Sequence, residues 1–105
     1  MIEVAEEMRS GWRVVAVRGR ADAAAADHLE SVLKTAVEAN AKVAADFSAL
    51  DYISSAGIRA VLQAARVAEG RQSEFAVCGL SPAAKKVFDM SGIQHVLRIH
   101  RELPC

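Results

Sequence analysis

The spacing of apolar residues changes several times along this chain, and each change predicts a new element. Near the N-terminus, apolar positions on both sides of Ser10-Gly11 predict two strands joined by a tight connection. The second of these strands contains Trp12, Val14 and Ala16, which alternate with Arg13, Val15 and Val17, so we expect it to be buried on at least one face. The period then lengthens after Gly19.

The next two elements are a helix and a buried strand. Asp22 can cap a helix whose apolar positions follow the three- and four-residue spacing of an amphipathic helix, and Asn40 is a suitable residue to end it. Lys42–Phe47 is a short apolar run that contains the polar residue Asp46 near its end. This pattern predicts a buried strand with a polar residue where it leaves the sheet.

The second half of the chain repeats the alternation of helix and strand. Helical spacing begins at Ser55 and ends near Gly70, where a glycine can take the left-handed C-cap conformation. A strand over Glu74–Cys78, a third helix over Ser81–Gly92 and a last strand over His95–His100 follow. The order β-β-α-β-α-β-α-β predicts an α/β domain with a mixed sheet of about five strands covered by helices.

Size and charge limit the possible functions. The 105 residues, 52% of them apolar, fit one domain spanning residues 1–105. Thirteen basic and thirteen acidic residues cancel, which argues against direct binding of nucleic acid or an anionic membrane. Cys78 and Cys105 lack the number and spacing of a disulfide framework or zinc site, which favours a reducing compartment. With no signal peptide or membrane-spanning run in the sequence, we expect a cytoplasmic protein.

The candidate for chemistry is the start of the second helix, where Ser54 and Ser55 precede Gly57. A helix N-terminus offers unpaired N–H groups and a positive dipole end, so a phosphate on Ser55 would be stabilised there. Gly57 costs about 1 kcal/mol relative to alanine, which suggests that its missing side chain leaves room for a partner or a phosphate. The alternative is that a serine only caps the helix and Gly57 relieves packing against the sheet.

Other sites of chemistry find little support in the sequence. His28, His95 and His100 have no metal-ligand spacing with a cysteine or an acidic cluster. Ile53 stands where a serine nucleophile elbow needs its first glycine, and no glycine-rich phosphate loop occurs. We therefore expect no metal, no cofactor and no enzymatic activity.

Two sequence elements resemble those of a known family. Asp46-Phe47-Ser48, followed by Ser54-Ser55-Ala56-Gly57-Ile58, is similar to the signature of STAS-domain anti-sigma factor antagonists, and Gly19-Arg20-Ala21-Asp22 matches a second family element. The resemblance covers essentially the whole chain. Two positions depart from the signature: Ser54 replaces the aspartate before the phosphoacceptor, and Ala56 replaces the serine that often follows it.

The resemblance implies a partner-switching module. The unphosphorylated protein would bind an anti-sigma factor that is also a serine kinase, and the kinase, using ATP and magnesium, would phosphorylate Ser55 and dissociate. A serine phosphatase would reset the switch. Ser54 is the alternative acceptor, and the expected partner-binding residues are Asp22, Asp46, Ser54, Ser55 and Gly57. A phosphate of about −1.5 to −2 charge beside Asp22, Asp46 and Asp51 would weaken the complex by repulsion.

Two other functions stay open at this point. The chain could be a STAS subunit of a transporter or lipid-transport complex that is never phosphorylated. It could also be a small enzyme with Ser55 as its nucleophile, although the motif supplies no neighbouring base. The sequence does not identify the client of the partner kinase, whether a sigma factor for stress or sporulation, a secretion system or another process.

Overall fold

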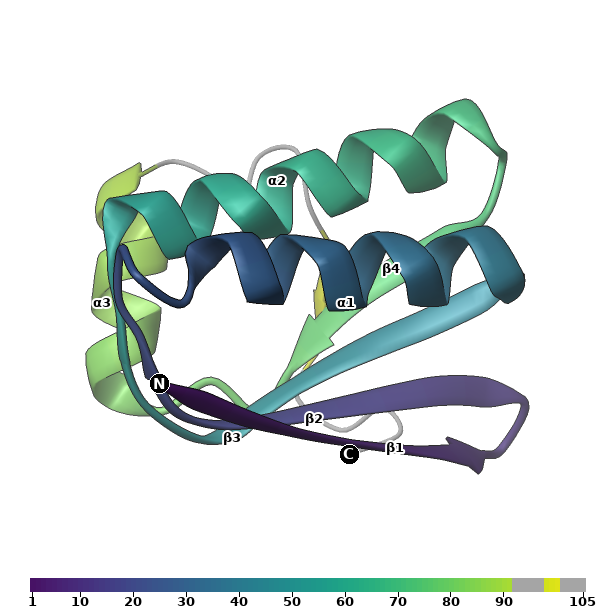
Figure 1. Cartoon of the computed structure of the whole chain (residues 1–105). Coiled ribbons are helices and arrows are strands. Elements are labelled where there is room, and N and C mark those ends of the chain that lie inside the picture. Colours follow the sequence, from purple (N-terminus) through teal and green to yellow (C-terminus); the bar gives the residue numbers. More distant parts are fainter. Residues whose placement is uncertain (92–97, 101–105) are drawn as a thin grey trace.

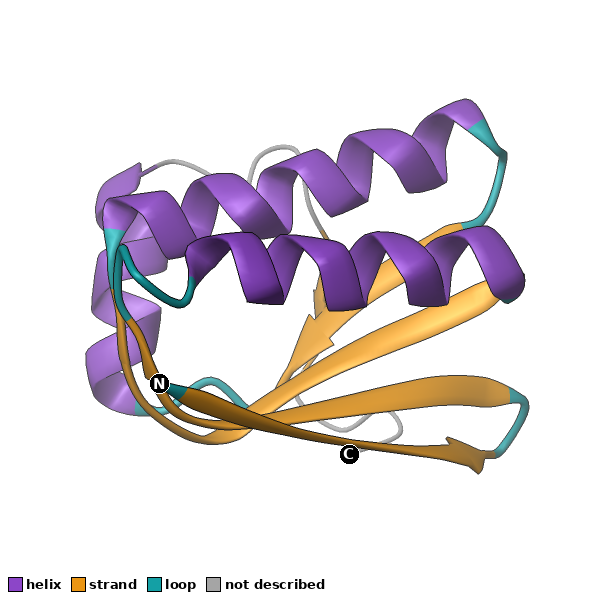
Figure 2. Cartoon of the chain, viewed as in Figure 1, coloured by secondary structure: helices purple, strands orange, loops and turns teal. Residues whose placement is uncertain are grey.

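The computed structural model of the chain describes residues 1–91 and 98–100. Helices and strands alternate along them in the predicted order β-β-α-β-α-β-α-β (Figures 1 and 2). The elements are β1 (Ile2–Arg9), β2 (Trp12–Ala21), α1 (Ala26–Ala39), β3 (Lys42–Ile53), α2 (Ser55–Gly70), β4 (Glu74–Cys78), α3 (Pro82–Ser91) and β5 (Arg98–His100). Residues 92 and 95–97, which the sequence assigned to the third helix and the last strand, lie outside the described residues.

The sheet is mixed, as predicted. Within the described residues, five strands pair in the order β1-β2-β3-β4-β5, with β1 antiparallel to β2 and the other neighbours parallel. A two-residue turn joins β1 to β2, in which Ser10 has φ 54° and Gly11 has φ 85°. Two successive residues with positive φ are typical of the type I′ hairpin turn, whose twist matches that of the flanking strands.

One face of the sheet carries the main hydrophobic core. Figures 1 and 2 show α1 and α2 side by side over this face, starting at the same end, with α3 standing at that end. Phe47 of β3 and Phe88 of α3 are both fully buried, and their ring centroids lie 6.2 Å apart. Burial of the apolar stripes of the helices against the strands therefore joins all three helices to one core.

A second, smaller hydrophobic cluster lies on the opposite face of the sheet. Trp12, Val14, Ala44, Ala76 and Cys78 are buried together, and successive side chains of a strand point to opposite faces. Cys78 is disulfide-bonded, and its partner lies outside the described residues. This differs from the expectation drawn from the cysteine count, because two cysteines are too few for a framework but enough for one bond. The cysteines therefore give no argument for a reducing compartment.

The third strand is longer than the sequence predicted. We expected it over Lys42–Phe47, followed by a loop, but β3 continues to Ile53 and pairs with β2 as far as Ala21. The pairing shifts register twice, so that β3 uses one extra residue between the partners of Ala16 and Arg18 and another between those of Gly19 and Arg20. Bulges of this kind break the two-residue alternation, which is why the pattern resembled a loop. Asp46 consequently lies inside the strand rather than at its exit.

The helix ends confirm most of the predicted signals. Ser81 caps α3, because the Ala84 N–H donates to its Oγ at 3.2 Å, and α3 begins at Pro82 as expected. Asn40 follows the last residue of α1 and has an extended backbone. Helix α2 does end at Gly70, but the left-handed residue is Gln72 with φ 58°, two residues farther along the chain.

In the part of the chain that the structure describes, no helix combines the length and the apolar character needed to cross a lipid bilayer. The predicted single α/β domain with three helices over a mixed sheet is otherwise confirmed.

Gly79 provides a test of how tightly β3 and the exit of β4 are packed. Its φ is +70°, and a Cβ there would lie 2.8 Å from Asp46 Oδ1 and 2.9 Å from the Ser48 Cβ. Gly11 also has a positive φ, but a Cβ there would meet nothing within 4 Å. We expect Gly11→Ala to destabilise by about 1 kcal/mol and Gly79→Ala by about 1–3 kcal/mol more, measured by urea unfolding. Equal losses of stability in the two variants would show that the close contacts around Gly79 add nothing to the cost of its positive φ.

Candidate functional site

The candidate site lies where β2 and β3 end and α2 begins. Ala21 and Ile53 are register partners at the ends of the two parallel strands, and both are buried. The carbonyl oxygen of Ala21 accepts two hydrogen bonds from Ser54, one from its N–H at 2.9 Å and one from its Oγ at 3.1 Å. This pair of hydrogen bonds to one carbonyl fixes the start of α2 against the end of β2.

Ser54 caps α2. The Gly57 N–H donates to the Ser54 Oγ at 3.1 Å, and the Ile58 N–H donates to the Ser54 carbonyl oxygen at 2.9 Å. The backbone of Ser54 is extended, as an N-cap residue requires. Its partly buried hydroxyl therefore both donates and accepts within the fold, so the capping role that the sequence left open belongs to this serine.

Ser55 differs from its neighbour in exposure and bonding. It is the first residue of α2 and is exposed to solvent. Within the described residues, its hydroxyl takes part in none of the recorded side-chain hydrogen bonds. The positive end of the helix dipole lies at this position, and no acidic residue occupies the first turn of α2. A negative group on Ser55 would therefore meet a favourable local field.

Gly57 makes room for the protein's own strands. It is buried, and a Cβ there would lie 2.8 Å from the Ile53 Cγ1 and 2.9 Å from the Ala21 carbonyl oxygen. The close approach is therefore between α2 and the ends of β2 and β3. The geometry supports the packing alternative, and it gives no support to the idea that the missing side chain leaves space for a partner or a phosphate.

Asp22 lies beside this junction but does not cap α1. The helix begins at Ala26, and its N-cap residue Ala25 makes no side-chain cap bond. The Asp22 Oδ1 accepts instead from the Ala25 N–H at 3.0 Å, in the turn that precedes the helix. The prediction placed the cap too early because the alanines after Asp22 first form this turn. The Asp22 side chain is 40% exposed, with the N-terminal ammonium of Met1 at 3.9 Å from Oδ2.

Asp46 is separated from this group of residues. It pairs with Ala16 and Cys78 in the middle of the sheet, and its Oδ1 accepts from the Ser48 N–H at 2.9 Å. Asp46 comes eight positions before Ser54, and all of the intervening residues belong to β3. The structure thus brings Asp22, Ser54, Ser55 and Gly57 together and leaves Asp46 at a different level of the sheet.

Two residues near the site were missed by the sequence argument. Arg20 and Tyr52 are register partners on β2 and β3, and the Arg20 guanidinium lies over the Tyr52 ring, 4.5 Å from its centroid. Tyr52 is 39% exposed. A cation over an aromatic face is attractive, so this contact links the two strands just before they end, two residues ahead of Ser54. Only the pairing of the strands reveals it, because the two residues are distant in sequence.

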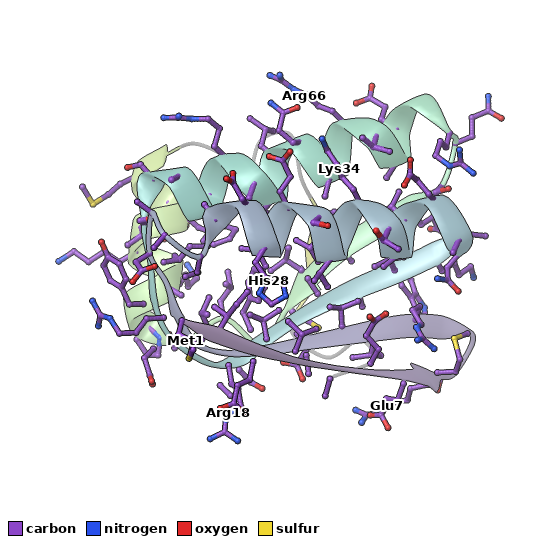
Figure 3. All side chains as sticks on the ribbon, in the orientation of Figure 1. Met1, Glu7, Arg18, His28, Lys34 and Arg66 are labelled. Atoms are coloured by element: carbon purple, nitrogen blue, oxygen red, sulfur yellow. The ribbon has the colours of Figure 1, made fainter. Side chains whose placement is uncertain are left out.

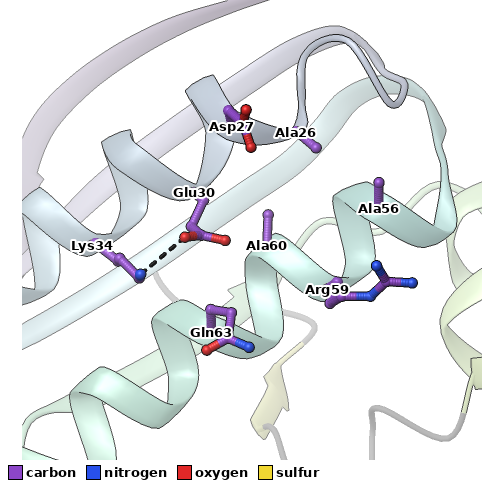
Figure 4. A pocket seen from close by; sticks show the side chains of 8 residues that line it. All are labelled: Ala26, Asp27, Glu30, Lys34, Ala56, Arg59, Ala60 and Gln63. Carbon is purple, nitrogen blue, oxygen red and sulfur yellow. Dashed lines mark ion pairs between the residues drawn. The ribbon is translucent and has the colours of Figure 1, made fainter.

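A shallow groove of about 320 Å³ runs between α1 and α2 and reaches Ala56, the residue after Ser55 (Figure 4). Three alanines and five charged or polar residues line it: Ala26, Asp27, Glu30 and Lys34 on α1, and Ala56, Arg59, Ala60 and Gln63 on α2. Glu30 and Lys34 form an ion pair across one helical turn at 2.9 Å. Among the described residues, no group of three or more histidine, cysteine or acidic side chains could hold a metal ion.

A family model described as the STAS domain matches residues 3–104. The chain belongs to the STAS domain family. The match covers nearly the whole domain and confirms the family resemblance that the sequence motifs carried. The observed β-β-α-β-α-β-α-β order is thus the fold of a family member.

Known proteins similar to this STAS domain carry a common name. BtrV of Bordetella bronchiseptica, provisionally named an anti-sigma factor antagonist, is 34% identical over 90 residues, which cover 85% of this chain and 78% of BtrV. An anti-sigma factor antagonist from Mycobacterium paratuberculosis has a similar structure, with a TM-score of 0.87, 23% identity, and coverage of 98% of this chain and 88% of that one.

The fold is also similar to that of the anti-sigma factor antagonist SpoIIAA in two states. The unphosphorylated form matches with a TM-score of 0.75 and 24% identity, covering 95% of this chain and 90% of SpoIIAA. The phosphorylated form, described as a Bacillus cell fate determinant, matches with a TM-score of 0.70 over 95% of this chain and 93% of that one.

The contrast between the two serines predicts different costs of substitution. Ser54→Ala removes the cap of α2 and the hydroxyl bond to Ala21, so we expect a loss of about 1–2 kcal/mol in the free energy of unfolding. Ser55→Ala is its matched control and should change stability by no more than about 0.5 kcal/mol, since the exposed hydroxyl forms no side-chain hydrogen bond with any other residue in the described part of the chain. Urea unfolding measures both. A larger loss for Ser55→Ala than for Ser54→Ala would contradict the assignment of the cap.

Proposed function

We propose that this STAS domain is an anti-sigma factor antagonist that works by partner switching. In its unphosphorylated form it binds an anti-sigma factor that is also a serine kinase, and phosphorylation of Ser55 ends that binding. A serine phosphatase restores the binding form. The observation that carries the proposal is the exposed Ser55 at the first position of α2, whose hydroxyl forms no side-chain hydrogen bond to the other described residues, next to Ser54, whose hydroxyl both donates and accepts within the fold.

Accessibility favours Ser55 over Ser54 as the phosphoacceptor. A kinase must reach the hydroxyl oxygen and must be able to remove its proton. The Ser54 hydroxyl is partly buried, donates to Ala21 and accepts from Gly57, so its modification would remove the bond to Ala21 and crowd the cap. Ser55 can be modified without the loss of either bond.

Charge explains why the modification would end binding. A phosphate adds about −1.5 to −2 charge to a surface where the exposed Asp51 and the half-exposed Asp22 already lie near the start of α2. Within the protein, the helix N-terminus accommodates this charge. Against a docked partner it meets desolvation and, where that partner faces it with acidic groups, repulsion. The effect is thus expected at the interface and not on the fold.

The contact surface of the proposal centres on Asp22, Ser54 and Ser55, extended by the Arg20–Tyr52 pair. Gly57 contributes indirectly, because its close packing sets the position of α2. Asp46 would influence binding through its hydrogen bond with the Ser48 N–H in the middle of β3, or would contact a large partner at the edge of the interface. Since the kinase requires ATP, the proposal places the protein in the cytoplasm.

The relatives support this function over the alternatives. BtrV and SpoIIAA share the name anti-sigma factor antagonist, and SpoIIAA has been obtained both with and without its phosphate. A constitutive subunit of a transporter or lipid-transport complex would need no free serine at this position. A serine hydrolase would need a base near Ser55, and the groove residues closest to α2 include no histidine.

The proposal predicts the site and the effect of phosphorylation. After incubation with a co-encoded anti-sigma factor kinase, ATP and magnesium, we expect the intact mass to rise by one phosphate, mapped to Ser55. Ser54→Ala should still accept the phosphate and Ser55→Ala should not. In a pull-down, Ser55→Ala should bind the kinase constitutively, and Ser55→Asp should bind at least about tenfold more weakly.

Two outcomes would count against the proposal. Phosphate mapped to Ser54 would reassign the acceptor. Equal binding of the kinase by Ser55→Ala and Ser55→Asp, with no phosphate added to the parent protein, would instead favour the unphosphorylated transport subunit.

A further inference from the structure

Arg59 is an exposed cation one turn after Ser55 on α2. In the part of the chain that the structure describes, no hydrogen bond or ion pair to its guanidinium is recorded. Figure 4 shows the guanidinium turned toward the N-terminal end of α2, where Ala56 is labelled, and not toward α1. Long helical side chains generally lean this way, over the turn that precedes them.

The neighbours of Arg59 leave it available. On the facing helix α1, Glu30 is already paired with Lys34 at 2.9 Å, and Asp27 makes no recorded bond to α2. Ala56 and Ala60, which flank Arg59 on α2, have side chains too short to restrict it. The Arg59 side chain is therefore free to move toward a negative group added to its own helix.

We propose that Arg59 is the intramolecular partner of the phosphate on Ser55 and fixes its orientation along α2. The inference rests on the proposed phosphorylation of Ser55. Residues four apart on a helix are neighbours, and an anion N-terminal to a cation is the favourable order. Arginine binds phosphate through parallel N–H donors, which gives the pair a defined geometry. Arg59 is thus a positioning residue for the modified state.

The pair has a consequence that can be measured. A cation close to the phosphate favours its doubly charged form, so Arg59 lowers the second pKa of phosphoserine 55. Carboxylates act in the opposite direction: Asp27 and Glu30 on α1, which line the same groove as Arg59, and Asp22, which precedes α1. Because these groups are unchanged in a variant of Arg59, the difference between the two proteins isolates its contribution.

The test uses the full chain with phosphoserine incorporated at position 55 during translation, so that no kinase is needed. Phosphorus NMR titration compares the parent protein with R59Q, and with R66Q as the matched control. Figure 3 shows Arg66 on the same helix, extending away from the sheet. We expect the second pKa of the phosphate to be higher in R59Q than in the parent by about 0.3 pH units, from the usual strength of such pairs.

The control variants complete the test. R66Q should titrate like the parent, and R59K, which keeps the charge but not the fork of donors, should fall between the parent and R59Q. The difference should shrink at about 1 M salt, where screening acts over roughly 3 Å. Identical titration of the parent and R59Q, or an equal shift in R66Q, would overturn the pairing. Because the phosphate is installed directly, this result is independent of whether a kinase modifies Ser55.

Discussion

The carbonyl oxygen of Ala21 is the contact on which the site depends. It lies at the end of β2, where the strand leaves the sheet and a backbone oxygen would otherwise lose its partner, and it accepts both the N–H and the hydroxyl of Ser54. A buried carbonyl must find donors, so the start of α2 is held at this place and in this orientation. Gly57 then packs directly against the same oxygen, and the buried side chain of Ile53 fills the remaining space. The position of Ser55 follows from these contacts, because it is the first residue beyond them.

The two neighbouring serines have different roles, which the sequence did not assign to one or the other: Ser54 caps α2, and Ser55 is the proposed phosphoacceptor. The family signature places an aspartate where this chain has Ser54, and both residue types can accept a hydrogen bond from a helix N–H. Serine keeps that cap and adds a donor, which the Ala21 carbonyl uses. An ionised aspartate could not donate in this way. The substitution therefore removes a charge beside Ser55 without loss of the cap, and the tie to β2 compensates for it within the fold.

The same contacts separate the groups that stabilise the domain from the site of the proposed switch. The groups that hold the junction are buried or bonded, whereas the side chains of Ser55 and Arg59 are exposed to solvent beside it. Ser81 repeats the arrangement at the start of α3, where its hydroxyl accepts from Ala84 and lies 3.5 Å from the Leu50 carbonyl. Two helices thus begin on serines tied to carbonyls at the end of β2 or within β3. A charge added at the exposed serine of α2 changes the surface while the hydrogen bonds beneath it remain.

The sequence by itself determined the order of the elements, the mixed sheet and the caps at Ser81 and Asn40, because hydrophobic period and capping chemistry are local properties. It also singled out Ser55, through the family motif. Tertiary structure alone decided the rest. With its two bulges, β3 continues to Ile53, beyond the point where apolar and polar residues stop alternating. A bulge forms only against a partner strand, so the sequence of β3 alone does not reveal it. Asp22, Ser54 and Gly57 meet only because parallel strands β2 and β3 end together, and Asp46 is left behind by the same pairing. Whether Gly57 made room for a partner or for β2 could not be told from its own segment, since the atoms that fill the space, Ala21 and Ile53, come from two different strands.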